Sequence, residues 1–256
     1  MNAADTRPTA TPIWVRLPTF QPRATNLLLG LLAVIYVYEI VAAGGAIDPA
    51  ESGDVLLTLG AKDNTLILAG EYWRLVSAMF LHASILHIAF NGYALLAFGQ
   101  QIERFYGIAR FLAIYFIAGL AGSIASFAFS PAESVGASGA ISGIIGAMCV
   151  FFWMQRRLLG AVARVQLWPA LVIVGLNAGL GVVQVGAVDY WAHGGGFLAG
   201  MVAAWLLAPR YHAGRFVAAD ERMLEDQISP WMATAIVLTL LAVELGLFAG
   251  ALLAQS

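Results

Sequence analysis

A serine and a histidine lie at the start of two strongly apolar segments of this chain. Ser138 stands in the run GASGA, and His193 follows 55 residues later in the run AHGGGFLAG. Polar side chains at membrane depth are energetically costly and are usually functional. A histidine that titrates near neutral pH can take the proton of a serine hydroxyl and so activate it as a nucleophile. The pair therefore predicts nucleophilic catalysis inside a membrane.

A tetrahedral intermediate at such a serine needs hydrogen-bond donors for its oxyanion, and three donors are available. Ser138 is expected to open a helix, where its backbone N–H has no intrahelical partner and lies at the positive end of the helix dipole. His87 and Asn91 are four residues apart on another apolar segment, so they share one helix face. These three residues are the candidate oxyanion site.

No carboxylate lies directly beside the histidine in sequence, so a dyad is favoured over a triad. Asp189, four residues before His193, is the only nearby candidate for a third member. A metal site built from His82, His87 and His193 is the competing interpretation, but no carboxylate or cysteine completes it. We expect no metal and no cofactor. For His82 alone, a structural hydrogen bond to the first outer loop is the favoured interpretation.

Small residues explain how two helices can bring the dyad together. Gly139 and Gly143 follow the serine, and Gly196 and Gly200 follow the histidine, each pair with the small-xxx-small spacing that lets membrane helices approach closely. Proton transfer needs the two side chains within about 2.6–3.2 Å. We expect the two helices to cross at these glycines.

Composition places the 256-residue chain among polytopic membrane proteins. It is 61% hydrophobic and only 11% charged, with a mean hydropathy of +0.81. A soluble core of this size cannot bury so much apolar surface, whereas a helical bundle exposes it to lipid. The single cysteine, Cys149, excludes an intrachain disulfide, and the net charge of −2 favours no nucleic-acid partner.

Seven apolar runs of helical length are expected, which predicts an all-α membrane bundle of six spans plus one. Residues 1–25 are expected to be a flexible tail, 26–209 the six-span core, 210–230 a linker, and 231–256 the seventh span and C-terminus. The expected spans are residues 26–43, 78–99, 108–129, 138–153, 167–185, 190–208 and 231–254.

The basic residues predict the orientation of these spans. Eleven of the thirteen fall on one side, and only Lys62 and Arg74 fall on the other. The positive-inside rule then places the N-terminus in the cytoplasm and the C-terminus outside. Counting from the cytoplasmic ends of their spans, Ser138, His193 and His87 all lie roughly 25–27 Å above that boundary. They are expected at one depth, near the outer surface, where water can reach them.

Together these runs resemble the rhomboid family of intramembrane serine proteases over about residues 73–200. The resemblance rests on Trp73-Arg74 in the first outer loop, the His82, His87 and Asn91 spacing, Glu103-Arg104, Gly136 with the GASGA run, and the glycines after His193. It implies a core that binds a substrate's transmembrane helix and cleaves it near the outer surface. It assigns structural support to His82, Trp73, Arg74, Gly136, Gly139, Gly196 and Gly200.

Two departures from the family pattern concern the packing of the histidine. Ser142 stands where many relatives place an aromatic residue that stacks on it, and Gly194 adds a third glycine to the start of that span. The leading hypothesis is an active protease of the bacterial inner membrane that acts on transmembrane proteins. A catalytically inactive rhomboid-like protein that binds membrane clients is the main alternative. A transporter is disfavoured, because no inverted repeat with broken helices is visible.

Overall fold

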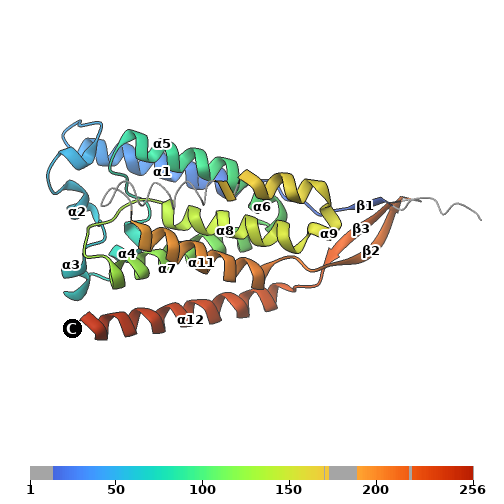
Figure 1. Ribbon diagram of the computed structural model, residues 1–256. Helices are drawn as coiled ribbons and strands as arrows, with labels where there is room; N and C mark the ends of the chain where they lie inside the picture. Colours follow the sequence, from blue (N-terminus) through green and yellow to red (C-terminus); the bar gives the residue numbers. More distant parts are fainter. Residues whose placement is uncertain (1–13, 170, 173–188, 219–220, 256) are drawn as a thin grey trace, which may run out of the picture.

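The computed structural model describes residues 14–169, 171–172, 189–218 and 221–255. Long helices run side by side, and a small sheet projects from one end of the bundle (Figure 1). The longer helical elements are α1 (Arg23–Ala42), α5 (Ile85–Ala94), the π-helical η2 (Leu95–Gly99), α6 (Gln100–Tyr106), α7 (Ile108–Phe129), α8 (Ser138–Met154), α11 (Tyr190–Leu207) and α12 (Pro230–Gln255). The prediction of a helical membrane bundle is confirmed.

Short elements lie between these helices. Residues 43–84 contain η1 (Pro49–Glu51), α2 (Val55–Leu59), α3 (Asn64–Leu68) and α4 (Arg74–Ser77), and α9 (Arg156–Leu159) follows α8. Residues 161–169 are also helical. The fifth expected span, residues 167–185, lies mostly outside the described residues.

Three of the described helices are long and apolar enough to cross a membrane. By length and composition, α1, α7 and α12 can each cross a membrane, and α8 is a shorter apolar helix. The bounds of α1, α7, α8, α11 and α12 agree with the expected spans to within three residues. The total of seven spans therefore stays a prediction.

The second expected span begins later than predicted. Its helix starts at Ile85 rather than at residue 78, because the extended Ser84 accepts a hydrogen bond from the backbone N–H of His87 as an N-cap. The helical path then continues without a break through η2 and α6 to Tyr106. His82 thus precedes the helix, and His87 lies in its first turn.

A three-stranded sheet joins two regions that were expected to be a tail and a linker. The strands are β1 (Trp14–Arg16), β2 (Tyr211–Ala218) and β3 (Glu221–Asp226), in the order β1-β3-β2. β1 pairs in parallel with β3, and β2 pairs with it antiparallel. Arg16 donates to Glu221 at 2.8 Å across this sheet. Residues 14–16 of the expected tail, and most of the expected linker, therefore form β-strands, so the fold contains a sheet as well as helices.

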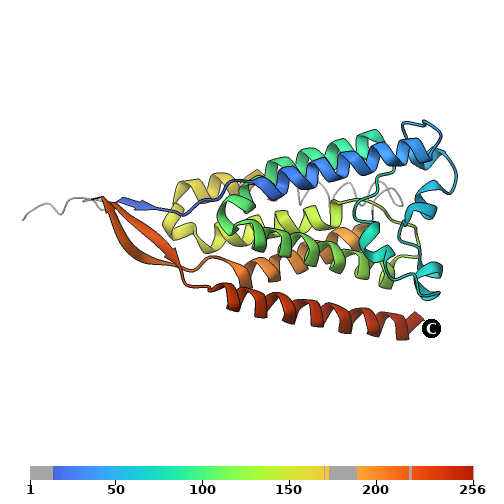
Figure 2. The same ribbon diagram turned by 180° about the vertical axis from the view of Figure 1, so that it is seen from behind.

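The arrangement of the helices puts several helix starts at one end of the bundle. The N-terminal ends of α5, α8 and α11 lie at the end opposite the sheet, and the C-terminal end of α12 lies there too (Figures 1 and 2). The helices α7, α8 and α11 form the centre of the bundle, whereas α12 lies on its outside. Of the most apolar 18 residues, 61% are buried in α7 but only 11% in α12.

Candidate active site

Ser138 and His193 are in direct contact. Ser138 is the first residue of α8, and His193 lies in the first turn of α11. The histidine Nε2 lies 2.6 Å from the serine Oγ. With the ring proton on Nδ1, Nε2 accepts a hydrogen bond from the hydroxyl, which is the geometry a general base requires. Two helix starts therefore bring together residues that are 55 positions apart.

Glycines allow the backbones of α8 and α11 to touch just below this pair. A Cβ atom built on Gly196 would lie 2.1 Å from the carbonyl oxygen of Gly139, and one on Gly200 would lie 2.3 Å from the Cα of Gly143. Only a residue without a side chain fits at either position. We call this contact, made by Gly139, Gly143, Gly196 and Gly200, the glycine seam.

Asp189 fixes the start of α11, and in the described part of the chain its carboxylate makes no hydrogen bond to the His193 ring. Its side chain caps the helix by accepting from the backbone N–H of Ala192 at 3.0 Å. Its other carboxylate oxygen accepts a short hydrogen bond from the Ser126 hydroxyl on α7. Because these are its side-chain hydrogen bonds within the described residues and neither reaches the His193 ring, the geometry favours a dyad with Asp189 as a positioning residue.

His87 and Asn91 point toward the residues just before the serine. A Cβ atom built on Gly136 would lie 2.7 Å from the His87 Nε2 and 3.6 Å from the Asn91 Nδ2. The Asn91 Nδ2 is buried and has no hydrogen-bond partner among the residues that the structure describes. Gly136 itself has a φ of +126°, which favours glycine on backbone grounds as well. Two side-chain nitrogens thus converge on a space next to Ser138 that a side chain at position 136 would fill.

The loop that leads into Ser138 is fixed by Lys62, a residue that was not predicted to belong to the site. The Nζ of Lys62 donates to the carbonyl oxygens of Ser130 at 2.7 Å and Ala132 at 2.9 Å. Lys62 also forms an isolated β-bridge with Ser134. Burial lowers the pKa of its ammonium group to about 8. A signal was present, because Lys62 is the only lysine of the chain and lies on the expected outer side, where basic residues are scarce.

Ser126 is a second residue that sequence reasoning missed. It is buried on α7 and bonds Asp189, as described above. Its position as a polar residue in an apolar span was a usable signal, because such residues are seldom without a partner.

The remaining predicted residues support the fold around the pair. Arg74 is buried and donates to the carbonyl oxygens of Leu57 and Ala61, which organises the first loop. The ring of Trp73 lies against Gly60. His82 is fully buried, its Nδ1 lies 3.2 Å from the carbonyl oxygen of Phe80, and its ring lies 5.1 Å from that of His87.

The described residues contain no group of three His, Cys, Asp or Glu side chains placed to bind a metal ion. The competing metal interpretation of His82, His87 and His193 therefore gains no support from the geometry of the described part of the chain.

Comparison with known proteins gives one family model and several relatives, all of the rhomboid family. The family model of the Rhomboid domain matches residues 69–210. Rhomboid protease GluP of Bacillus subtilis is 40% identical over 184 residues, which cover 72% of this chain and 34% of that protein. In Arabidopsis thaliana, the chloroplastic RHOMBOID-like protein 9 is 36% identical over 158 residues, covering 62% of this chain and 36% of that protein. RHOMBOID-like protein 5 from the same plant is 35% identical over 198 residues, covering 75% and 57%.

The matched region is only part of each relative. The chain spans between about a third and just over a half of the length of these three proteins. The region that the family model matches, residues 69–210, contains Ser138, His193, His87 and Asn91.

Proposed function

We propose, because the chain belongs to the rhomboid family of multi-pass membrane proteins, that it is an intramembrane serine endopeptidase with a Ser138–His193 dyad. The 2.6 Å contact between the His193 Nε2 and the Ser138 Oγ is the observation that carries the proposal. The substrates are transmembrane proteins, cleaved near the outer face of the membrane. No cofactor is needed for this chemistry.

The reaction begins when the Ser138 Oγ attacks the carbonyl carbon of the scissile peptide bond. His193 takes the hydroxyl proton at Nε2, and the peptide oxygen becomes an oxyanion. The same histidine then gives its proton to the leaving amine nitrogen, which leaves an acyl group on the serine oxygen. Water attacks this ester, again with His193 as base, and the serine is released.

The oxyanion is stabilised by donors from two helices. The Ser138 backbone N–H, at the start of α8, lacks an intrahelical acceptor. The His87 Nε2 and the Asn91 Nδ2 converge beside Gly136, two residues before the nucleophile. The unpartnered Asn91 nitrogen is a donor already desolvated in the free protein, as a preorganised oxyanion site requires.

Labelling with a serine-directed fluorophosphonate tests the nucleophile. We expect the wild-type protein to be labelled and to cleave a model transmembrane substrate, and Ser138→Ala and His193→Ala to do neither while keeping their thermal stability. Ser142→Ala, one turn further along α8, is the matched control and should behave as wild type. Normal turnover by Ser138→Ala or His193→Ala would refute the dyad.

The inactive rhomboid-like alternative gives a distinct result. A folded wild-type protein that binds a transmembrane client but takes up no fluorophosphonate at any pH would replace the protease proposal with that of a client-binding protein.

The proposed location is the bacterial inner membrane, with the N-terminus in the cytoplasm and the active site opening outward. In a Cys149→Ala background, we expect the exposed position 133 (Glu133→Cys) to react with an impermeant maleimide added outside, and the exposed position 161 (Ala161→Cys) to be protected. The reverse pattern would invert the orientation and place cleavage at the cytoplasmic face.

A further inference from the structure

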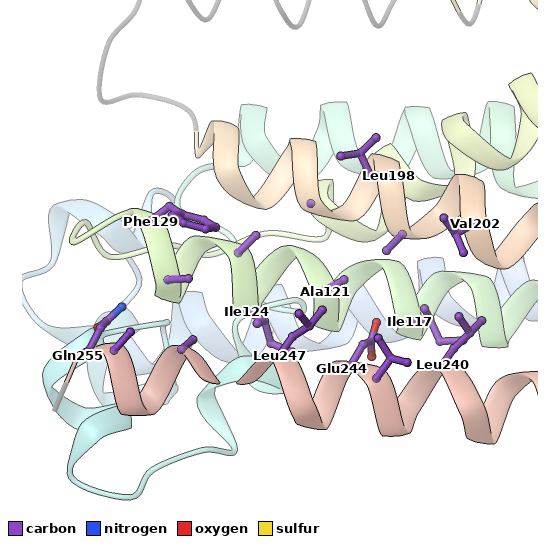
Figure 3. A pocket seen from close by; sticks show the side chains of 17 residues that line it. Ile117, Ala121, Ile124, Phe129, Leu198, Val202, Leu240, Glu244, Leu247 and Gln255 are labelled. Carbon is purple, nitrogen blue, oxygen red and sulfur yellow. The ribbon is translucent and has the colours of Figure 1, made fainter. Parts of the chain in front are cut away.

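A cavity of about 600 Å³ lies between α7, α11 and α12, away from the glycine seam. Its walls are almost entirely apolar, and its volume comes from small residues such as Ala121, Ala125 and Ala199. Figure 3 shows it as a space bounded by α12 on one side and by α7 and α11 on the other. Small-molecule sites in proteins have volumes of about 300–1,000 Å³ and combine apolar walls with few polar groups.

Glu244 supplies the polar group of this cavity. It is only 4% exposed, and neither of its carboxylate oxygens has a hydrogen-bond partner in the described part of the chain. Its carboxyl group points from α12 toward α7, beside Ile117 and Leu240 (Figure 3). A buried carboxyl group without a partner is energetically costly in an apolar environment, so a partner is expected.

The other two buried glutamates show how this fold normally satisfies such a group. Glu103 accepts from the backbone N–H groups of Ala24 and Thr25 and from the Thr25 hydroxyl. Glu39 accepts from the backbone N–H of His82. Glu244 alone among the three buried glutamates has both oxygens unpaired, and it alone lines the cavity.

The lining offers no positive charge and no free donor to Glu244. The one other polar side chain among the lining residues is the amide of Gln255, which donates to the carbonyl oxygen of Phe127. It lies eleven residues further along α12, about 16 Å away along the helix axis. The missing partner must therefore come from outside the lining residues.

We propose that this cavity binds a lipophilic primary amine, with the hydrocarbon chain against the alanines and the amine on Glu244. An amine can pair with Glu244 either as an ammonium ion beside a carboxylate or as a neutral amine beside a carboxylic acid. The two forms differ only in the position of one proton, and the pair is neutral as a whole in both. A hydroxyl group carries no charge, so it leaves the charge of an ionised Glu244 uncompensated. With a protonated Glu244 it forms only a neutral hydrogen bond, which is about half as strong as a charge-assisted one. A phospholipid tail fills the volume but leaves Glu244 unpaired.

The test uses the full-length protein in lipid nanodiscs with dodecylamine as the probe. We expect increasing mole fractions of dodecylamine to raise the midpoint of thermal unfolding with saturation, and dodecan-1-ol and dodecane to do so much less. In Glu244→Gln, the amine concentration at half-saturation should rise at least about tenfold, as the loss of one charged hydrogen bond predicts. Ala121→Leu fills the cavity and should abolish the saturable effect.

Leu245→Ala is the matched control, because Leu245 is the next residue of α12 and is 65% exposed on the lipid side. It should bind dodecylamine as the wild type does. The proposal fails if the wild type shows no saturable effect, if dodecanol or dodecane stabilises as well as the amine, or if Glu244→Gln keeps the wild-type half-saturation. If Glu244→Gln does not fold, the comparison of the three probes on the wild type and Ala121→Leu decides. None of these measurements depends on protease activity.

Discussion

The two sides of α11 make contacts of different kinds. Toward α8 it meets the glycine seam, where a single added carbon would lie 2.1–2.3 Å from backbone atoms. Toward α12 it helps to line a cavity of about 600 Å³. The seam joins the two proposed catalytic residues, whereas none of the proposed catalytic chemistry depends on the cavity. Close backbone packing is found where two side chains must meet within hydrogen-bonding distance, and loose side-chain packing where they need not.

The first prediction compares a substitution in the glycine seam with the same substitution at a glycine of α12, which serves as the control. Gly200→Leu should reduce cleavage by more than the roughly 10²-fold expected for a 1 Å misplacement, because even its Cβ would lie 2.3 Å from the Cα of Gly143. Gly250→Leu should leave cleavage unchanged, since no atom of the described residues lies within 4 Å of a Cβ built there. Substrate cleavage and thermal unfolding are measured for both variants. Equal losses in the two, or none in either, would contradict the comparison.

The second prediction concerns the two side-chain donors on α5 that are proposed to stabilise the oxyanion. His87→Ala and Asn91→Ala should each lower the turnover number about 10²–10³-fold, because each removes a donor aimed at the developing oxyanion. Tyr93→Ala is the control on the same helix, because Tyr93 is 71% exposed. Wild-type rates in both donor variants, with folding checked by thermal unfolding, would show that these residues serve packing only.

The third prediction tests whether Lys62 is buried in the folded protein, where it contacts the loop before Ser138. The Lys62 pKa is about 8 in the folded state and 10.5 in its unperturbed state, so between these values the unfolded chain binds more protons. The free energy of unfolding should therefore increase as the pH rises from about 8 to 10.5, by up to about 3 kcal/mol from this group. A neutral amine still donates two hydrogen bonds and can keep both carbonyl contacts.

Lys62→Met provides the comparison for this pH profile. It lacks the titrating group, so the rise between pH 8 and 10.5 should be absent or much smaller in denaturant unfolding of the variant. A profile as steep as that of the wild type would assign the pH dependence to other groups.

The smallest effect is expected on the cavity side. Truncation after Gln227 removes α12, which packs on the outside of the bundle and carries no residue of the proposed dyad or oxyanion site. Ser138 should keep its fluorophosphonate reactivity within about tenfold, although the protein is expected to unfold at a lower temperature. The truncated Ser138→Ala variant is the control. Complete loss of labelling in a folded truncation would make α12 part of the active site.

Local sequence patterns predicted most helices but not all of their starts. Continuous apolar composition placed α7 and α8 closely, because hydrophobic length is a direct requirement of the bilayer. The start of α5 was wrong by seven residues, since apolar composition continues upstream while the cap at Ser84 sets the boundary. The sheet was not expected at all. The pairing of β1 with β3 leaves no local pattern because these strands are about 200 residues apart, whereas β2 and β3 are neighbours in sequence within the segment predicted to be a linker.

The sequence by itself determined which residue types were available for the chemistry and that the chain is a membrane bundle. Ser138, His193, His87 and Asn91 were identified from type and spacing, because polar side chains are rare and costly in apolar segments. Only the tertiary structure decided the direction of each side chain. It directed the Asp189 carboxylate toward Ser126 and a helix start, and it brought Lys62 to the loop before Ser138. It also left Glu244 beside a cavity without a hydrogen-bond partner among the described residues. These outcomes depend on contacts between distant segments, and the free energy of such contacts is set by packing geometry rather than by local composition.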